Sequence, residues 1–299
     1  MPNTLVHLGI QGMGNRLIST RIDLKWVFLG CIIPDLPWIF RRALIALVPG
    51  IDHYDVTLYA AVQASLLFCV LLSLVFALLS ERPRLVFGIL AVNALIHLLL
   101  DTIEIKWGNG VFLLAPLTWQ FLSFGWVWPD SVFIAILSLA GLVFGIWVLV
   151  HPASSSIDLR FKPPGRIVAA IFLLSLYMLT PLALSYGPLS ANIMSIATLQ
   201  EKERRVGKEV RIDRRPYQHR AEGDVVITLA DEPLRVAGDT RATSSQVSLI
   251  GEFVAFDTIR IDQLHEYHFS WRDLASYAGL GLIALVWCAA LIRERRYRQ

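Results

Sequence analysis

The fold is decided by residues 85–103, which read LVFGILAVNALIHLLLDTI. A helix of this length crosses a bilayer, because about 20 apolar residues span roughly 30 Å of hydrocarbon. The polar residues Asn93, His97 and Asp101 recur every fourth position and therefore share one helix face. An imidazole and a carboxylate in hydrocarbon are costly unless a partner, a cavity or a metal compensates them. We therefore expect function on this face, where the i, i+4 spacing lets two side chains bind one ion.

The composition is that of an integral membrane protein. Of its 299 residues, 55% are hydrophobic and 17% are charged. A further polar-faced stretch, Asn3–Ser19, is either a surface helix or a seventh crossing. We therefore predict an α-helical polytopic membrane protein with six or seven spanning helices, surrounded by membrane lipids. The six long apolar stretches are Trp26–Val48, Val56–Ser80, Leu85–Ile103, Val132–Val150, Ile167–Leu184 and Leu274–Ile292.

The distribution of Lys and Arg predicts the orientation in the membrane. Arg82 and Arg84 lie between two apolar stretches, and four arginines lie within residues 293–298. By the positive-inside rule both places are cytoplasmic, so the C-terminus is inside and residues 190–271 are outside. The net charge of +3 is explained by these loops, and we expect no nucleic-acid partner.

Between the last two apolar stretches the sequence changes to a β pattern. Short alternating runs separated by Gly, Asp and Pro are typical of strands joined by turns. We predict an extracytoplasmic β-domain at residues 190–271, between a helical core at 1–189 and a spanning helix with a basic tail at 272–299. Strand number and length are similar to those of an OB-type barrel, which identifies no ligand or protein partner. The expected strands are Val206–Asp213, Asp224–Ala230, Leu234–Ala237, Gln246–Ala255 and Thr258–Leu264.

Several His and Asp residues of the N-terminal third are candidate metal ligands. Each also has a structural interpretation: a polar surface residue, a helix cap between prolines, an outer loop, or a polar contact between two helices. Nitrogen and carboxylate oxygen donors together suit zinc, or another divalent ion such as manganese. Asn93 would orient the ring of His97, and Asp55 and Glu104 are candidate catalytic groups for a second ion, general base catalysis or substrate positioning. The candidate metal ligands are His7, Asp35, His53, His97 and Asp101.

The order and spacing of these residues resemble the bacterial inner-membrane metal-dependent hydrolases of the LexA-regulated type. The resemblance covers about residues 4–120, and its most specific part runs from His97 to Pro116. Two family motifs are incomplete: Pro37 and Trp38 replace an Asp and a His, and Leu58 replaces a second His. The matching positions are His7, Ile33-Pro34-Asp35, His53, Thr57, His97, Asp101, Thr102, Gly108 and Leu113-Leu114-Ala115-Pro116.

This resemblance implies a helical hydrolase core in a bacterial inner membrane, related to zinc-dependent phospholipase C and nuclease P1. The hypothesis is a metal-dependent hydrolase of a phosphoester, such as a lipid-linked one, at the outer leaflet. The alternative is a non-catalytic membrane protein with a structural His/Asp cluster and a β-domain that contacts a partner. A shared site requires Asn3–Ser19 to bring His7 to the outer-facing residues, with Trp38–Val48 at the interface and Val111–Val127 re-entrant or interfacial.

Overall fold

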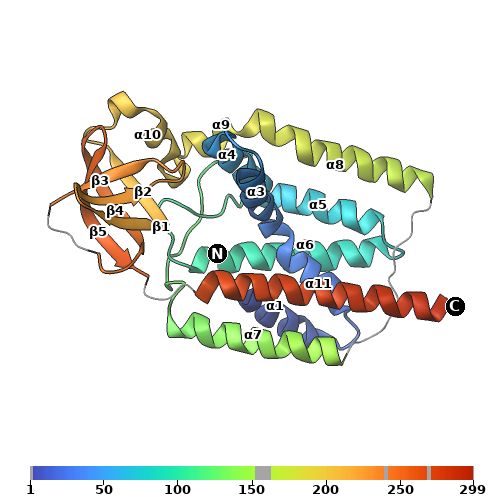
Figure 1. The fold of residues 1–299 in the computed structure, drawn as a ribbon. Helices are drawn as coiled ribbons and strands as arrows, with labels where there is room; N and C mark the ends of the chain where they lie inside the picture. The colour runs from blue at the N-terminus through green and yellow to red at the C-terminus, as the bar shows by residue number, and fades with distance from the viewer. Residues whose placement is uncertain (1–2, 152–162, 239–241, 268–270, 299) are drawn as a thin grey trace.

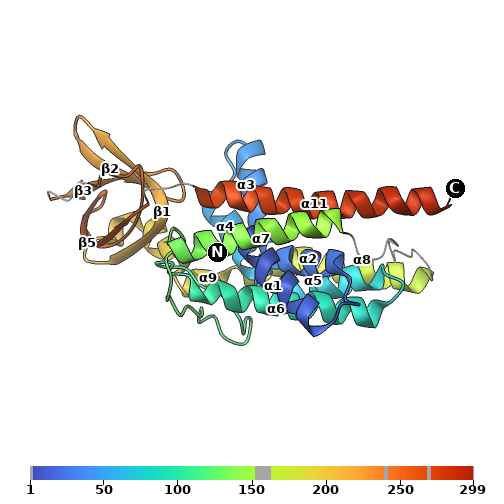
Figure 2. The same cartoon turned by 90° about the horizontal axis from the view of Figure 1, so that it is seen from below.

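The computed structural model describes residues 3–151, 163–238, 242–267 and 271–298. It contains a helical body with a small five-stranded sheet at one end (Figure 1). The last helix runs from the sheet end of the body to the opposite end, where the C-terminus lies in both views (Figures 1 and 2). The β-domain and the C-terminus are therefore separated by the length of the helical body.

Four helices are long and apolar enough to cross a membrane. Among the described residues these are α6 (Pro83–Ile103), α7 (Val132–Val150), α8 (Pro164–Leu184, continued to Ser190 by α9, Tyr186–Ser190) and α11 (Trp271–Arg298, apolar to Ile292). Large apolar side chains on α7 and α8 face outward, and only 17% of the α8 span is buried. An apolar surface of this extent is typical of helices that face lipid, so the structure indicates membrane association.

Six or seven spanning helices are not supported. Helices α4 (His53–Gln63) and α5 (Leu66–Leu78) are bent by 70° and give at most a fifth span. The predicted span Trp26–Val48 is instead α2 (Leu24–Ile32), a 3-10 turn η1 (Ile33–Asp35) and α3 (Leu36–Leu47). Prolines at 34 and 37 explain this break, because each lacks a backbone N–H and clashes with the preceding turn.

The N-terminal helix α1 (Thr4–Ile18) is buried inside the helical body rather than on its surface. It has 15 residues, about 22 Å at 1.5 Å per residue, and packs between α2, α7 and α11. Glycines allow this close approach, since a Cβ placed on Gly141 of α7 would lie 1.9 Å from the carbonyl oxygen of Leu5. Small residues at helix contacts are the usual means of close packing in membranes. This contact fixes the position of His7 next to α6.

The β-domain contains the five expected strands. They are β1 (Glu209–Arg220), β2 (Gly223–Ile227), β3 (Pro233–Ala237), β4 (Gln246–Ala255) and β5 (Thr258–Glu266). Their pairings close in the order β1-β2-β3-β5-β4, and only β3 and β5 are parallel. Strand β1 is longer than predicted because a bulge between Ile212 and Arg215 lets it continue to Arg220. The OB-type assignment stays a prediction.

Short helices and an irregular segment join these parts. Between α8 and β1 lie α9 (Tyr186–Ser190), η2 (Ile193–Ser195), α10 (Ile196–Gln200) and η3 (Lys202–Arg204). The segment from Glu104 to Ser131 contains no helix and is held by the isolated bridges Glu104↔Val127 and Val111↔Leu122. Part of this segment, including Val111 and Phe112, lines a small cavity beside Asp101. It therefore covers the end of α6 near the candidate site, without a re-entrant helix.

Candidate metal centre

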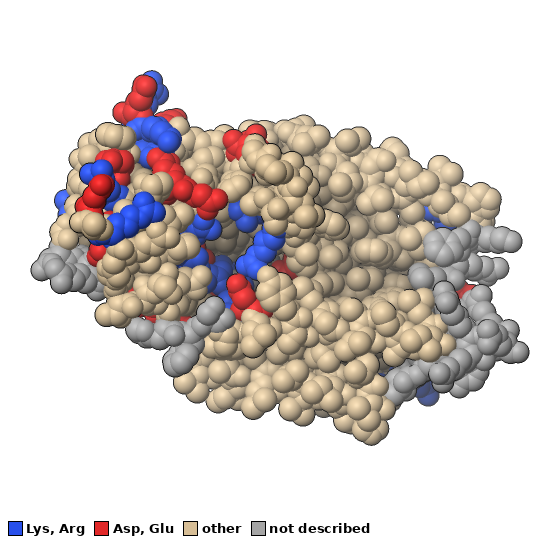
Figure 3. All heavy atoms as spheres, viewed as in Figure 1, with Lys and Arg blue, Asp and Glu red and all other residues tan. Residues whose placement is uncertain are grey.

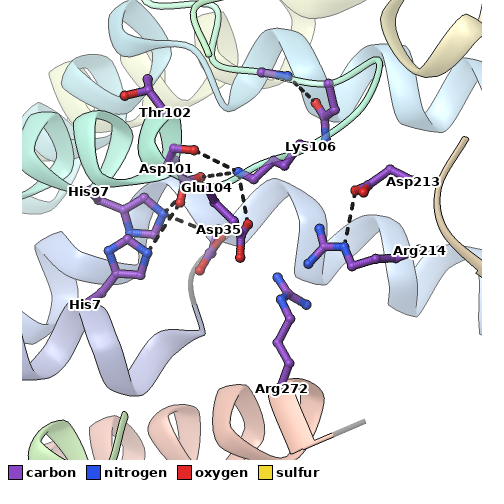
Figure 4. A network of polar contacts seen from close by, with 12 residues as sticks. His7, Asp35, His97, Asp101, Thr102, Glu104, Lys106, Asp213, Arg214 and Arg272 are labelled. Carbon is purple, nitrogen blue, oxygen red and sulfur yellow. Dashed lines mark hydrogen bonds and ion pairs between the residues drawn. The ribbon is translucent and has the colours of Figure 1, made fainter. Parts of the chain in front are cut away.

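Two helices bring three candidate ligands together in the interior. His7 comes from α1, and His97 and Asp101 come from consecutive turns of α6 (Figure 4). One donor atom from each of the three lies within 4.8 Å of the others, and all three side chains are buried. His7 Nε2 is 3.4 Å from Asp101 Oδ1, and His97 Nε2 is 3.8 Å from Asp101 Oδ2. The spacing of His97 and Asp101 thus produces the shared face expected from the sequence.

Asp35 adds a second carboxylate to this cluster. It ends the 3-10 turn η1 after α2, and its Oδ1 lies 3.7 Å from His97 Nε2. Helix α2 approaches α6 closely at Gly30, where a Cβ would lie 2.8 Å from the Cβ of Asn93. This close packing sets the level at which Asp35 meets His97. Four of the five predicted metal ligands therefore lie in one place.

The ring of His97 presents a lone pair to the carboxylates. Its Nδ1 lies 2.5 Å from the carbonyl oxygen of Cys31, which can only accept, so Nδ1 carries the proton in the neutral ring. Among the described residues, His7 Nε2, His97 Nε2 and Asp101 Oδ1 are buried without a hydrogen-bond partner. A lone pair that faces carboxylates in a buried site needs a proton or a cation between them. The donor set therefore fits a divalent ion.

The two imidazole rings limit how an ion can bind. The His7 and His97 rings are stacked, with centroids 3.7 Å apart and planes 6° from parallel. Lone pairs lie in the ring plane, so two parallel rings cannot both point at one ion, and binding requires one ring to rotate. Gln11 Nε2 lies 3.4 Å from His7 Nδ1. If His7 binds an ion through Nε2, the proton of its neutral ring is on Nδ1, so the carboxamide oxygen of Gln11 must face Nδ1 to accept it.

Lys106 is a member of the cluster that the sequence analysis missed. Its Nζ lies 3.6 Å from Asp101 Oδ2 and 3.6 Å from Glu104 Oε2, and it donates to the carbonyl oxygen of Asp101. Burial alone would raise the pKa of Glu104, but nearby positive charges, including Arg214 and Lys106, hold this pKa at about 2. Glu104 is therefore ionised beside an ammonium group. The signal in the sequence was that Lys106 is the only Lys or Arg between Asp101 and Arg160.

The structure does not bring His53 and Asp55 to the cluster of His7, His97 and Asp101. His53 is the first residue of α4, and its Nδ1 lies 3.2 Å from the carbonyl oxygen of Leu229 in the β-domain. Asp55 is exposed in the same first turn. Asp52 caps α4 by accepting from the amides of residues 54 and 55, and His53 in the same turn contacts the β-domain.

Asn93 does not orient the ring of His97. Its Oδ1 accepts from Asn15 Nδ2 at 2.9 Å, and its Nδ2 donates to the carbonyl oxygen of Ile89. Asn93 therefore joins α1 to α6 one turn away from His97. The carbonyl oxygen of Cys31 holds the ring instead.

No protein-family profile, curated protein or solved structure matches this chain. The resemblance to inner-membrane hydrolases thus stays a prediction. What the fold and site define is a largely helical protein with candidate membrane spans, a five-stranded domain and a buried His/Asp group that could hold a metal ion.

Proposed function

We propose that this protein is a membrane-embedded hydrolase that uses a divalent metal ion, zinc in the first instance and manganese as the alternative. The single observation behind this is the buried group of His7, His97 and Asp101, whose facing donor atoms have no hydrogen-bond partners among the described residues. Two imidazole nitrogens and a carboxylate oxygen are a common ligand set of catalytic zinc, which leaves a fourth position for water. Asp35 lies close enough to be a fourth ligand or to accept a proton from that water.

The chain supplies charge and orientation around the reacting atoms. When bound, a divalent ion lowers the pKa of its water toward neutrality and polarises a phosphoryl oxygen. The carbonyl oxygen of Cys31 fixes the proton of His97 on Nδ1, which keeps Nε2 available as a ligand. Lys106, held between Asp101 and Glu104, is placed to stabilise negative charge that develops on the substrate.

We infer that the substrate is a phosphoester. The position of the site at one end of a candidate spanning helix favours a phosphoester that is linked to a lipid. Asp101 and Lys106 line a cavity of about 30 Å³ at the end of α6 that faces the β-domain. If the spanning helices lie in the membrane, this end is at headgroup depth. With the Lys and Arg distribution, this supports a site at the outer leaflet of a bacterial inner membrane, with the C-terminus cytoplasmic.

A non-catalytic function is the second candidate, and two observations favour it. The stacked rings of His7 and His97 are not oriented toward one ion. Lys106 already places a positive charge 3.6 Å from Asp101. In this case the cluster would only join α1 to α6, as polar contacts between membrane helices do.

Hydrolysis by the full-length protein in detergent separates the two functions. The metal is removed with a chelator, zinc or manganese is restored, and cleavage of bis(p-nitrophenyl) phosphate and of phosphatidic acid is followed. We expect restored activity, a loss of at least about 100-fold in H97A, and near wild-type activity in H53A. Stoichiometric metal binding without hydrolysis of either substrate would favour the structural function.

A further inference from the structure

An arginine-rich cavity lies between the β-domain and the helical body. It has a volume of about 230 Å³ and opens where Figure 3 shows blue atoms gathered around a hollow. Three aspartates also line it, Asp130, Asp213 and Asp273, so its charged side chains are mainly positive. The arginines come from α3, β1 and the start of α11, and they are Arg41, Arg42, Arg211, Arg214, Arg215 and Arg272.

Arg214 is held in this cavity by a strained backbone. It lies on the β1 bulge with a φ of 50°, a conformation uncommon for a residue other than Gly, Asn or Asp. Its Nε lies 3.2 Å from Asp213, but its buried Nη1 has no hydrogen-bond partner among the described residues. Figure 4 shows its guanidinium group turned toward Arg272 and the Glu104–Lys106 pair. Bulges often redirect a side chain toward a functional site, and strain of this kind is concentrated at such sites.

Arg41 is the one arginine of this cavity without an ion pair to a described carboxylate. The other five are paired: Arg42 and Arg272 with Asp273, Arg211 with Glu209, Arg214 with Asp213, and Arg215 with Asp231. The Nε of Arg41 donates to Thr57 Oγ1, and no described carboxylate lies within 4.0 Å of its guanidinium group. Burial first, and then the charges of Arg215 and Arg42, lower the pKa of Arg41 to about 10. The unpaired charge of Arg41 therefore lies beside Arg42 and Arg215 in a partly desolvated space, where an anion would be stabilised.

We propose that this cavity binds a phosphate or diphosphate group, carried either by a lipid or by a soluble molecule. Planar guanidinium groups bind phosphate oxygens in pairs, which makes arginine the preferred residue for this chemistry. The volume is below the roughly 300 Å³ of typical pockets for whole small molecules, so a compact anionic group fits better than a large ligand.

The cavity also lies next to the His/Asp cluster. Trp38 and Asn109 line both this cavity and the small cavity that contains Asp101 and Lys106. A phosphate held by the arginines would therefore place its ester group near the metal ligands. That substrate role depends on the proposed hydrolase function, whereas anion binding itself does not.

Calorimetric titration of the full-length protein in detergent tests the anion site. The probes are inorganic pyrophosphate and dihexanoyl phosphatidic acid, with dihexanoyl phosphatidylcholine as the uncharged-headgroup control. Arg214→Asn removes the charge but suits the left-handed backbone, and Arg41→Gln changes the opposite wall. Arg235→Gln, in an exposed side chain of β3 outside the cavity, is the matched control.

We expect R214N and R41Q to weaken binding by roughly tenfold or more, and R235Q to leave it unchanged. Binding of pyrophosphate identifies a soluble anion, and binding of phosphatidic acid alone identifies a lipid headgroup. If R214N does not fold, R41Q decides. Failure of the wild type to bind either probe, or equal affinity in R41Q and R235Q, would overturn the proposal. Repeating the titration with H97A separates anion binding from metal-dependent function.

Discussion

The contact between α1 and α7 gives the most quantitative prediction, through the substitution Gly141→Ala. A Cβ at this position would lie 1.9 Å from the carbonyl oxygen of Leu5 and 2.7 Å from its carbonyl carbon. Both are backbone atoms, so a rotamer change cannot relieve the clash. To reach the 3.0 Å below which real Cβ contacts are essentially never seen, α1 must move away by about 1.1 Å.

That movement acts directly on the candidate site. His7 is one turn or less from the clash on α1, and its Nε2 now lies 3.4 Å from Asp101 Oδ1. Metal–ligand distances tolerate only about 0.2 Å, so a shift of this size removes His7 as a ligand. Overpacking of a tight contact costs about 1–3 kcal/mol, and we expect G141A to lose this much stability together with most of its bound zinc.

The assay is zinc content by mass spectrometry after loading and desalting, with thermal unfolding of the same samples. Gly14→Ala is the matched control, because it lies on α1 itself and nothing lies within 4 Å of its added Cβ. G14A should keep its zinc and its melting temperature. If G141A also keeps both, the close approach of α1 and α7 does not position the site as described.

Three further predictions concern other residues. H53A should retain its metal and lose at most about 1 kcal/mol of stability, because His53 contacts the β-domain rather than the cluster; zinc analysis and thermal unfolding check this. E104Q should destabilise the protein at neutral pH, because folding lowers the pKa of Glu104 from 4.5 to about 2. The contribution of this carboxylate to the free energy of unfolding is complete above pH 4.5 and disappears as the pH falls toward 2. Unfolding curves recorded across this pH range measure the effect. R205M should cost about 3 kcal/mol in denaturant unfolding of the β-domain, since the fully buried Arg205 binds Glu232 through both of its terminal nitrogens; a change below 1 kcal/mol would contradict it.

Some of the fold and the site could be predicted from the sequence. Helix α6 was predicted almost to the residue. Its apolar run begins just after a proline, and its polar residues Asn93, His97 and Asp101 recur every fourth position. The convergence of His7 with His97 and Asp101 was expected because a shared metal site, as the resemblance to inner-membrane hydrolases implies, requires it. The five strands were predicted from the alternation of apolar and polar residues in short runs that end at turn-forming residues.

Other features depend on contacts that local sequence does not encode. Hydropathy cannot distinguish a straight span from one broken at Pro34 and Pro37, which explains why Trp26–Val48 was predicted as one span. The position of His53 is set by packing of α4 against the β-domain, far away in the sequence. The left-handed conformation of Arg214 arises from a bulge that only strand pairing reveals.

The proposed function requires His7, His97 and Asp101 to bind one metal ion. X-ray absorption at the zinc edge of the zinc-loaded full-length protein tests it most directly. We predict scattering from two imidazoles with nitrogens about 2.0–2.1 Å from zinc, together with oxygen ligands and no sulfur. A sulfur ligand would point to the nearby Cys31, whose thiol faces Gln11, and an all-oxygen shell would indicate surface binding. Either of these results, or the absence of bound zinc after desalting, would show that these three residues do not bind zinc as proposed.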